Sequence, residues 1–140
     1  MSNQYSMKIY PAGRGREVYR NIEICGSSTL NQLCQVILES FDFIDEHLYE
    51  FCMDNRMYSE HAYQSDPEGD EPSADITLDE VGLCKGQKFA LHYDFGDDWM
   101  FTITVSKISE VQEDFEPCVI KSKGTIQQYP DWDEDDFDEE

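Results

Sequence analysis

The chain has 140 residues, of which 39% are hydrophobic and 13% aromatic, which is enough for one globular domain with its own core. Its 31 acidic and 10 basic side chains give a net charge of −21. Such a surface repels phosphate backbones and anionic lipids, so direct nucleic-acid or membrane binding is not expected. Five widely spaced cysteines, and no visible secretory signal or membrane span, predict a cytoplasmic protein with reduced and mostly buried thiols.

The chain begins with a pattern typical of a hairpin. Residues 5–10 and 17–24 alternate between apolar and polar side chains, and the segment 11–16 between them is rich in glycine and other turn formers. This order predicts two antiparallel strands joined by a loop. The hairpin also has a small basic island on an otherwise acidic protein, made up of Arg14, Arg16 and Arg20.

Residues 29–41 give the clearest helical pattern in the sequence. Apolar side chains recur there at helical spacing, and Thr29 with Gln32 fits a capping box at the start of the helix, with Ser28 as the alternative cap. The alternation that follows at 48–53 predicts a strand. After a turn signal, residues 56–58 are expected to form its short partner strand.

The next segments are shorter and more polar. Residues 64–75 include two prolines and a glycine and no large apolar side chain, so a loop is expected. Residues 77–83 predict a short helical turn that ends near Gly82. A last strand is expected over residues 118–122.

The strongest pattern surrounds the stretch 93–99, which contains three acids, a glycine and three aromatic side chains. Apolar side chains alternate on both sides of it, which predicts a long antiparallel hairpin with one apolar face. The two alternations share that face if Phe95 pairs with Trp99 across the three-residue loop 96–98. This register requires a positive φ at Asp98, which aspartate tolerates better than most residues.

Together these elements predict an α+β fold with a β-grasp-like core. The expected sheet is antiparallel or mixed, with one main helix packed on one face and the long hairpin beneath that helix. We expect a single domain over residues 1–125, followed by an acidic, disordered tail over residues 126–140. The last ten residues of this tail contain eight acids, with Trp132 and Phe137 among them.

Several strings resemble the Ri-plasmid ORF-3-like family, whose members are also described as passenger proteins of insertion elements. They are Thr29-Leu30 with Leu33 and Ile37, His47-Leu48-Tyr49-Glu50-Phe51, and above all Tyr93-Asp94-Phe95-Gly96-Asp97-Asp98-Trp99. The resemblance covers residues 5–125 and implies an α+β, β-grasp-like fold and no established biochemical activity. Family members often have histidines at the positions of Tyr49 and Phe101, so chemistry that depends on those histidines is not expected here.

The tip of the long hairpin is the candidate binding site, with Asp94, Asp97, Asp98, Trp99 and His47. A divalent cation could bind to the three carboxylates, with His47 or His92 as a further ligand. Alternatively, the three acids cap the turn and remain solvated, which is the commoner role of aspartate in turns. The sequence has no nucleophile elbow and no local Cys–His pair, so we predict no catalytic residue, no resident metal and no cofactor.

These features favour a small binding or adaptor module over an enzyme, with another protein of basic character as its partner. Two alternatives stay open. The first is a cation-dependent enzyme centred on Asp94, Asp97 and Asp98. The second is an acidic mimic of nucleic acid, in which the tail and the acidic surface inhibit a DNA-binding protein.

Overall fold

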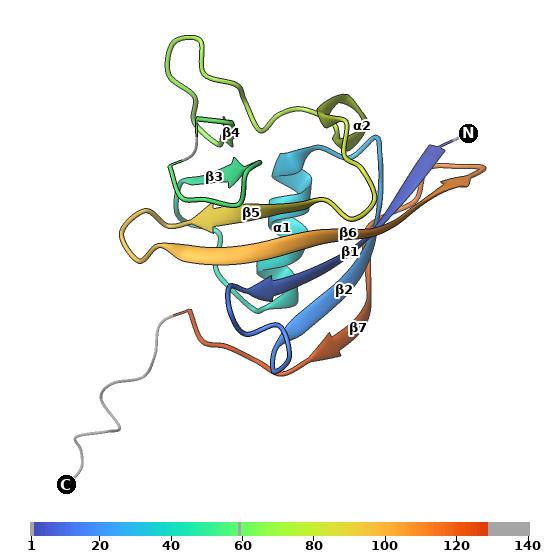
Figure 1. The fold of residues 1–140 in the computed structure, drawn as a ribbon, viewed down its shortest axis with the longest axis horizontal. Helices are drawn as coiled ribbons and strands as arrows, with labels where there is room; N and C mark the ends of the chain where they lie inside the picture. The colour runs from blue at the N-terminus through green and yellow to red at the C-terminus, as the bar shows by residue number, and fades with distance from the viewer. Residues whose placement is uncertain (1, 59, 129–140) are drawn as a thin grey trace, which may run out of the picture.

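The computed structural model describes residues 2–58 and 60–128. Within these residues, seven strands form one sheet in the order β4-β3-β5-β6-β1-β2-β7, accompanied by two helices (Figure 1). The strands are β1 (Ser2–Pro11), β2 (Tyr19–Cys25), β3 (Tyr49–Cys52), β4 (Ala62–Gln64), β5 (Lys88–Tyr93), β6 (Trp99–Val111) and β7 (Cys118–Lys123). The helices are α1 (Leu30–Ser40) and α2 (Leu78–Val81).

The predicted α+β, β-grasp-like fold with a main helix is wrong. Strand accounts for 41% of the structure and helix for 12%, and all six strand pairings in the described residues are antiparallel. The difference arises at β1, which pairs with β2 on one side and with the long strand β6 on the other. Because β7 then pairs antiparallel with β2, the sheet extends on that side without a parallel pair.

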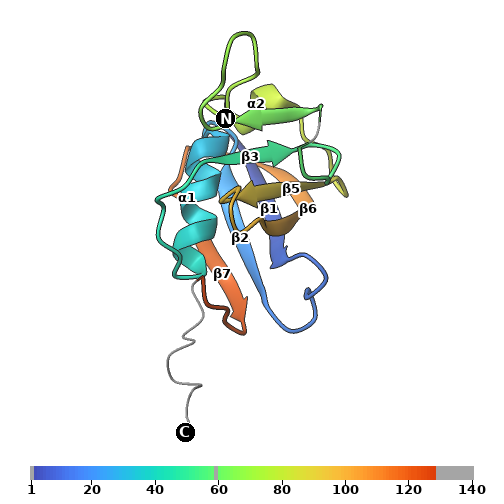
Figure 2. The same cartoon turned by 90° about the vertical axis from the view of Figure 1, so that its left-hand side faces the viewer.

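Helix α1 lies across one face of the sheet (Figure 2). It begins as predicted, because Thr29 Oγ1 accepts a hydrogen bond from the Gln32 backbone N–H at 3.1 Å, and the Gln32 side chain accepts from the Thr29 N–H at 2.8 Å. Its apolar stripe packs onto the inward side chains of the sheet. The core between them includes Met7, Ile9, Leu33, Ile37, Leu91, Phe101 and Ile103. Each such side chain contributes about 1.5–3 kcal/mol on burial.

The long hairpin forms with the predicted faces but with a register shifted from the prediction. Tyr93 pairs with Trp99, so that the loop has five residues, from Asp94 to Asp98. The chain leaves the strand early because Asp94 has a φ of 65°, and Asp98 has the expected positive φ, at 53°. Phe95 therefore does not continue the apolar row beneath α1.

Most of the other predicted elements are confirmed, namely the hairpin of β1 and β2, the strands β3 and β7, and α2. The partner of β3 is β4, whereas the segment 56–58 forms no strand. All five cysteines are free, and three of them are buried. No helix within residues 2–58 and 60–128 is long and apolar enough to span a bilayer. Of the predicted tail, residues 129–140, with Trp132 and Phe137, lie outside the described residues.

Candidate functional site

The hairpin tip contains the aspartates predicted as a binding site, but their carboxylates have different partners. Asp94 is buried, and its Oδ1 accepts hydrogen bonds from the backbone N–H groups of Gly96 at 3.0 Å and Asp97 at 3.3 Å. Its Oδ2 lies 3.3 Å from Nε2 of His47. Asp94 therefore caps the turn, as aspartates in turns commonly do, and positions His47 beside it.

A second group of the tip lies on the sheet face opposite α1. His92 is fully buried there, with Nδ1 2.7 Å from Glu50 Oε2 and Nε2 2.6 Å from Asp98 Oδ1. The Glu50 carboxylate, 2% exposed, also accepts hydrogen bonds from the Tyr58 backbone N–H and the Gln64 side chain. Burial raises the pKa of Glu50, but the hydrogen bonds from His92, Tyr58 and Gln64 outweigh it, so that its pKa lies below the ordinary 4.5.

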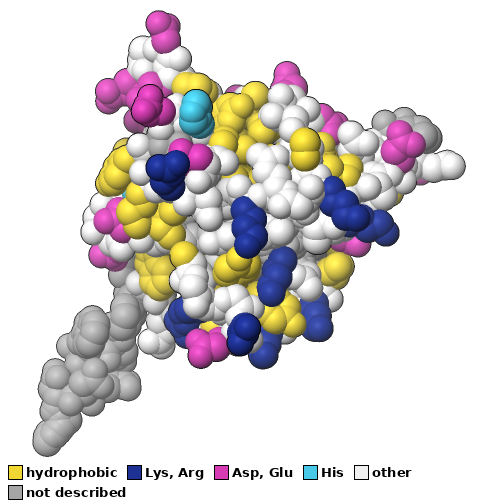
Figure 3. Space-filling model, viewed as in Figure 1, with side chains coloured by type: hydrophobic (Ala, Val, Ile, Leu, Met, Phe, Trp, Pro, Cys, Tyr) yellow, Lys and Arg dark blue, Asp and Glu magenta, His cyan; other side chains and the backbone are white. Residues whose placement is uncertain are grey.

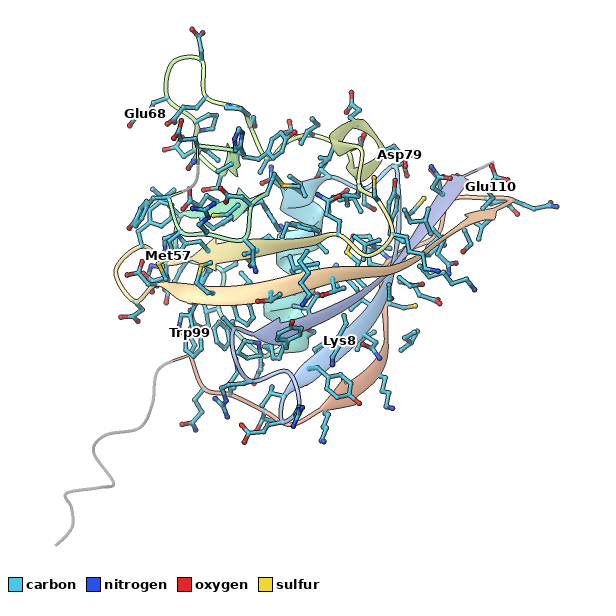
Figure 4. The ribbon with its side chains drawn as sticks, viewed as in Figure 1. Lys8, Met57, Glu68, Asp79, Trp99 and Glu110 are labelled. Carbon is cyan, nitrogen blue, oxygen red and sulfur yellow. The ribbon has the colours of Figure 1, made fainter. Side chains whose placement is uncertain are left out.

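Trp99 does not join these acids. Its ring packs edge-on against Phe43, with centroids 4.9 Å apart, and stacks with Phe101 at the end of the sheet (Figure 4). In the described part of the chain, no three His, Cys, Asp or Glu side chains are placed to hold a metal ion together. The Asp94 carboxylate thus serves the turn, and the Asp98 carboxylate contacts the buried histidine.

A site that the sequence reasoning missed lies on the open face of the sheet, opposite α1. The strand register places five side chains in one row across five strands: Lys121 on β7, Asn21 on β2, Lys8 on β1, Thr104 on β6 and Lys88 on β5. Neighbouring strands lie about 4.8 Å apart, so the row is about 19 Å long. We call this row, with its three lysines, the basic row.

Three members of the basic row, Lys8, Thr104 and Lys88, line an open groove of about 770 Å³. Arg14 and Arg16, from the connection between β1 and β2, also line this groove, together with Thr102, Thr104 and Ser106 of β6. Lys and Arg side chains gather on this face, whereas most of the acids in the same view lie toward its margins (Figure 3). The face therefore has the opposite charge to the chain as a whole.

Two lysines of the row, Lys8 and Lys121, lie near tyrosine rings. Lys8 Nζ lies 4.8 Å from the ring centroid of Tyr19 and 5.4 Å from that of Tyr10, and Lys121 Nζ lies 5.9 Å from the Tyr19 ring. None of the three lysines of the row forms an ion pair within residues 2–58 and 60–128, whereas Arg14 pairs with Glu17 at 3.4 Å. The row thus offers positive charge to a ligand.

The basic island predicted at the first hairpin divides between the two faces. Arg14 and Arg16 line the groove, but Arg20 is buried on the α1 side, where its Nε donates to the Ser40 carbonyl at 2.7 Å and its guanidinium lies over the Phe41 ring. Burial lowers the pKa of Arg20. Strand alternation alone could have predicted that Arg20 points inward. The basic row could not be predicted in the same way, because it depends on the order of the strands, which the sequence did not indicate.

Comparison with known proteins gives a family and a fold. Residues 3–139 match the family described as plasmid pRiA4b ORF-3-like protein. Among solved structures, the chain is similar to a protein of unknown function from Methanosarcina mazei Go1, with a TM-score of 0.73 and 24% sequence identity. That similarity covers 91% of this chain and 74% of the other, and it shows a shared fold. No curated protein matches the chain.

Proposed function

The chain belongs to the family of plasmid pRiA4b ORF-3-like proteins, and we propose that it is a protein-binding module that takes an acidic polypeptide segment on the open face of its sheet. The descriptions of the family and of the similar structure name no activity, so the proposal depends on the geometry of the groove. The observation that supports it is the basic row, which aligns three lysines on a chain of net charge −21.

The dimensions of the row suit a short extended segment. An extended chain advances about 3.3 Å per residue, so about six residues match the 19 Å row. Consecutive lysines of the row are two strands apart, or about 10 Å, which corresponds to the length of about three residues of such a segment. The hydroxyl groups of Thr102, Thr104 and Ser106 could donate hydrogen bonds to the backbone of the segment or accept them from it.

The charge around the groove favours a short acidic segment over a nucleic acid. A nucleic-acid strand that continued beyond the groove would meet the acids at its margins and be repelled by them. An acidic stretch within a polypeptide ends where neutral residues begin and avoids this repulsion. The net charge of the chain predicted a basic partner. We propose an acidic partner instead, because the charges in the groove are the ones that face the ligand.

The test is a fluorescence-anisotropy titration of the full chain against a fluorescein-labelled hexaglutamate peptide. We expect binding that weakens with salt, and at least tenfold weaker binding for the double variant Lys8→Glu/Lys88→Glu. Each exposed ion pair contributes about 0.2–1 kcal/mol. The reversal also adds repulsion at both positions. The total loss of binding free energy should therefore exceed about 1.4 kcal/mol, which corresponds to a factor of ten in affinity.

The matched control is Lys85→Glu, which makes the same change of charge at an exposed lysine that does not line the groove. It should bind the peptide almost as the wild type does. Equal losses in the control and in a single Lys8→Glu variant would contradict a specific groove. Tighter binding of a single-stranded oligonucleotide than of the peptide would replace the proposal with a nucleic-acid site.

A further inference from the structure

The groove has a candidate occupant within the same chain. Residues 131–140 contain eight acids and no base, and two aromatic side chains, Trp132 and Phe137, lie among those acids in the sequence. The groove presents the complementary set of Lys8, Lys88, Arg14, Arg16 and the ring of Tyr10, and Lys121 and the ring of Tyr19 lie beside it. Charge and aromatic content therefore match between the two.

The chain passes close to the groove before it reaches this acidic segment. At the end of β7, the Lys123 ammonium donates to the Arg16 carbonyl at 2.8 Å. The next residue, Gly124, is so close to the Glu17 backbone that a Cβ there would lie 2.4 Å from the carbonyl oxygen. Arg16 and Glu17 both line the groove. The strand that leads to the acidic segment is therefore fixed against the wall of the groove.

The last described residue, Gln128, is held by hydrogen bonds near the end of the sheet at which β6 begins. Its side-chain oxygen accepts a hydrogen bond from the Ile44 backbone N–H at 2.7 Å. The neighbouring Phe43 packs on Trp99, the first residue of β6. The next residue of β6, Met100, accepts a hydrogen bond from the backbone N–H of Ala12. Ala12 lies at the start of the connection that lines the groove. Twelve residues follow Gln128 in the sequence. They span at most about 40 Å when extended, and the acidic segment begins three residues after Gln128.

We propose that residues 131–140 bind the basic groove of their own chain and compete there with any external acidic segment. This inference rests on the proposed function, because it assigns an occupant and a mode of regulation to the same groove. A tethered segment acts at a millimolar effective concentration, so a contact that is weak between separate molecules is largely formed within one chain. An external partner must displace the segment before it can bind.

The test compares two full-length variants with the same change of charge. The tail variant neutralises five acids of the segment: Asp131→Asn, Asp133→Asn, Glu134→Gln, Asp135→Asn and Asp136→Asn. The control variant neutralises five exposed acids of the connection before α2: Asp66→Asn, Glu68→Gln, Asp70→Asn, Glu71→Gln and Asp75→Asn. Two quantities are measured for each protein, the affinity for labelled hexaglutamate and, without peptide, the amide chemical shifts of the basic row.

We expect the tail variant to bind hexaglutamate at least fivefold more tightly than the wild type, and the control variant to change by less than twofold. The amide shifts of Lys8, Thr104 and Lys88 should move in the tail variant and remain in place in the control. Equal affinities of the two variants, with unchanged shifts in both, would overturn the inference while the proposed function stands, since the peptide still binds.

The two proposals fail in different ways. If none of the three proteins binds the peptide while the tail variant still shifts the amides of the row, the external acidic partner is refuted and the contact within the chain is supported. If peptide binding is absent and the shifts do not move, both proposals are refuted. In a Lys8→Glu/Lys88→Glu variant, the Thr104 amide shift should not move further when the tail is neutralised as well.

Discussion

Replacing His92 with leucine tests how the buried part of the hairpin tip is stabilised. The imidazole lies between two carboxylates in different surroundings, since Glu50 is buried and the Asp98 side chain is 41% exposed. Without the imidazole, water can hydrate Asp98 where it stands. Glu50 instead remains in a buried site with hydrogen bonds from the Tyr58 N–H and the Gln64 side chain. The cost of the substitution should therefore come from Glu50.

Removing one partner of a buried ion pair costs about 3–5 kcal/mol, and an exposed pair contributes about 0.2–1 kcal/mol. Because Glu50 keeps two donors, we expect His92→Leu to lower the free energy of unfolding by about 3–4 kcal/mol. Asp98→Asn removes the exposed charge alone and retains a residue that tolerates the φ of 53°, so its cost should stay below about 1 kcal/mol. The double variant Glu50→Gln/His92→Leu should be more stable than His92→Leu, since no charge is left buried without its partner.

The assay is urea unfolding followed by far-UV circular dichroism, with reductant present because all five cysteines are free thiols. A cost for His92→Leu no larger than that of Asp98→Asn would refute the reasoning, and so would a double variant less stable than the single one. If His92→Leu does not fold, His92→Gln takes its place, because its amide can still donate to Glu50. Its stability should lie below that of Asp98→Asn, because a neutral amide replaces the imidazole as the donor to Glu50.

Three further expectations concern pH, the turn and β7. The pKa of Glu50 is lower in the folded chain than in the unfolded chain, so its carboxylate stabilises the fold above about pH 4.5 and loses that effect as the pH falls through the folded value. Glu50→Gln should therefore flatten the decline of Tm on acidification relative to the wild type. Asp94→Ala should cost about 1–2 kcal/mol in thermal unfolding, because it removes the cap of the turn and a residue suited to a φ of 65°, and Asp94→Asn should recover most of the loss. Gly124→Ala should cost about 2 kcal/mol or more, because its φ is +73° and its Cβ would approach the Glu17 carbonyl, and amide exchange should accelerate in β7.

Features that depend on a few neighbouring residues were predictable from the sequence. The capping box of α1 depends on Thr29 and Gln32 alone, and the sequence located it. The faces of the long hairpin follow from alternation, and they were also correct. The register was not, because it depends on the backbone of Asp94, which leaves the strand early to accept hydrogen bonds from the turn.

The fold class and the basic row depend on the order of the strands, which local patterns do not determine. Pairing of β1 with β6 makes the sheet antiparallel throughout, and the two strands are far apart in the sequence. The same pairing brings Lys8 beside Thr104 and hence near Lys88. Asp97 and Asp98 were correctly placed in the turn, but the contact of His92, the partner of Asp98, with Glu50 depends on the pairing of β3 with β5.

Strand β7 forms an edge of the sheet, and all six of its residues are exposed. Val119 and Ile120 are apolar, with 41% and 55% of their surface exposed, and an edge of this kind can pair with a strand from another molecule. Lysines on an edge strand oppose such pairing, and β7 has two, Lys121 and Lys123. An acidic ligand on the basic row that neutralised Lys121 would weaken this protection, so occupancy of the row and the tendency of copies to associate through β7 would be linked.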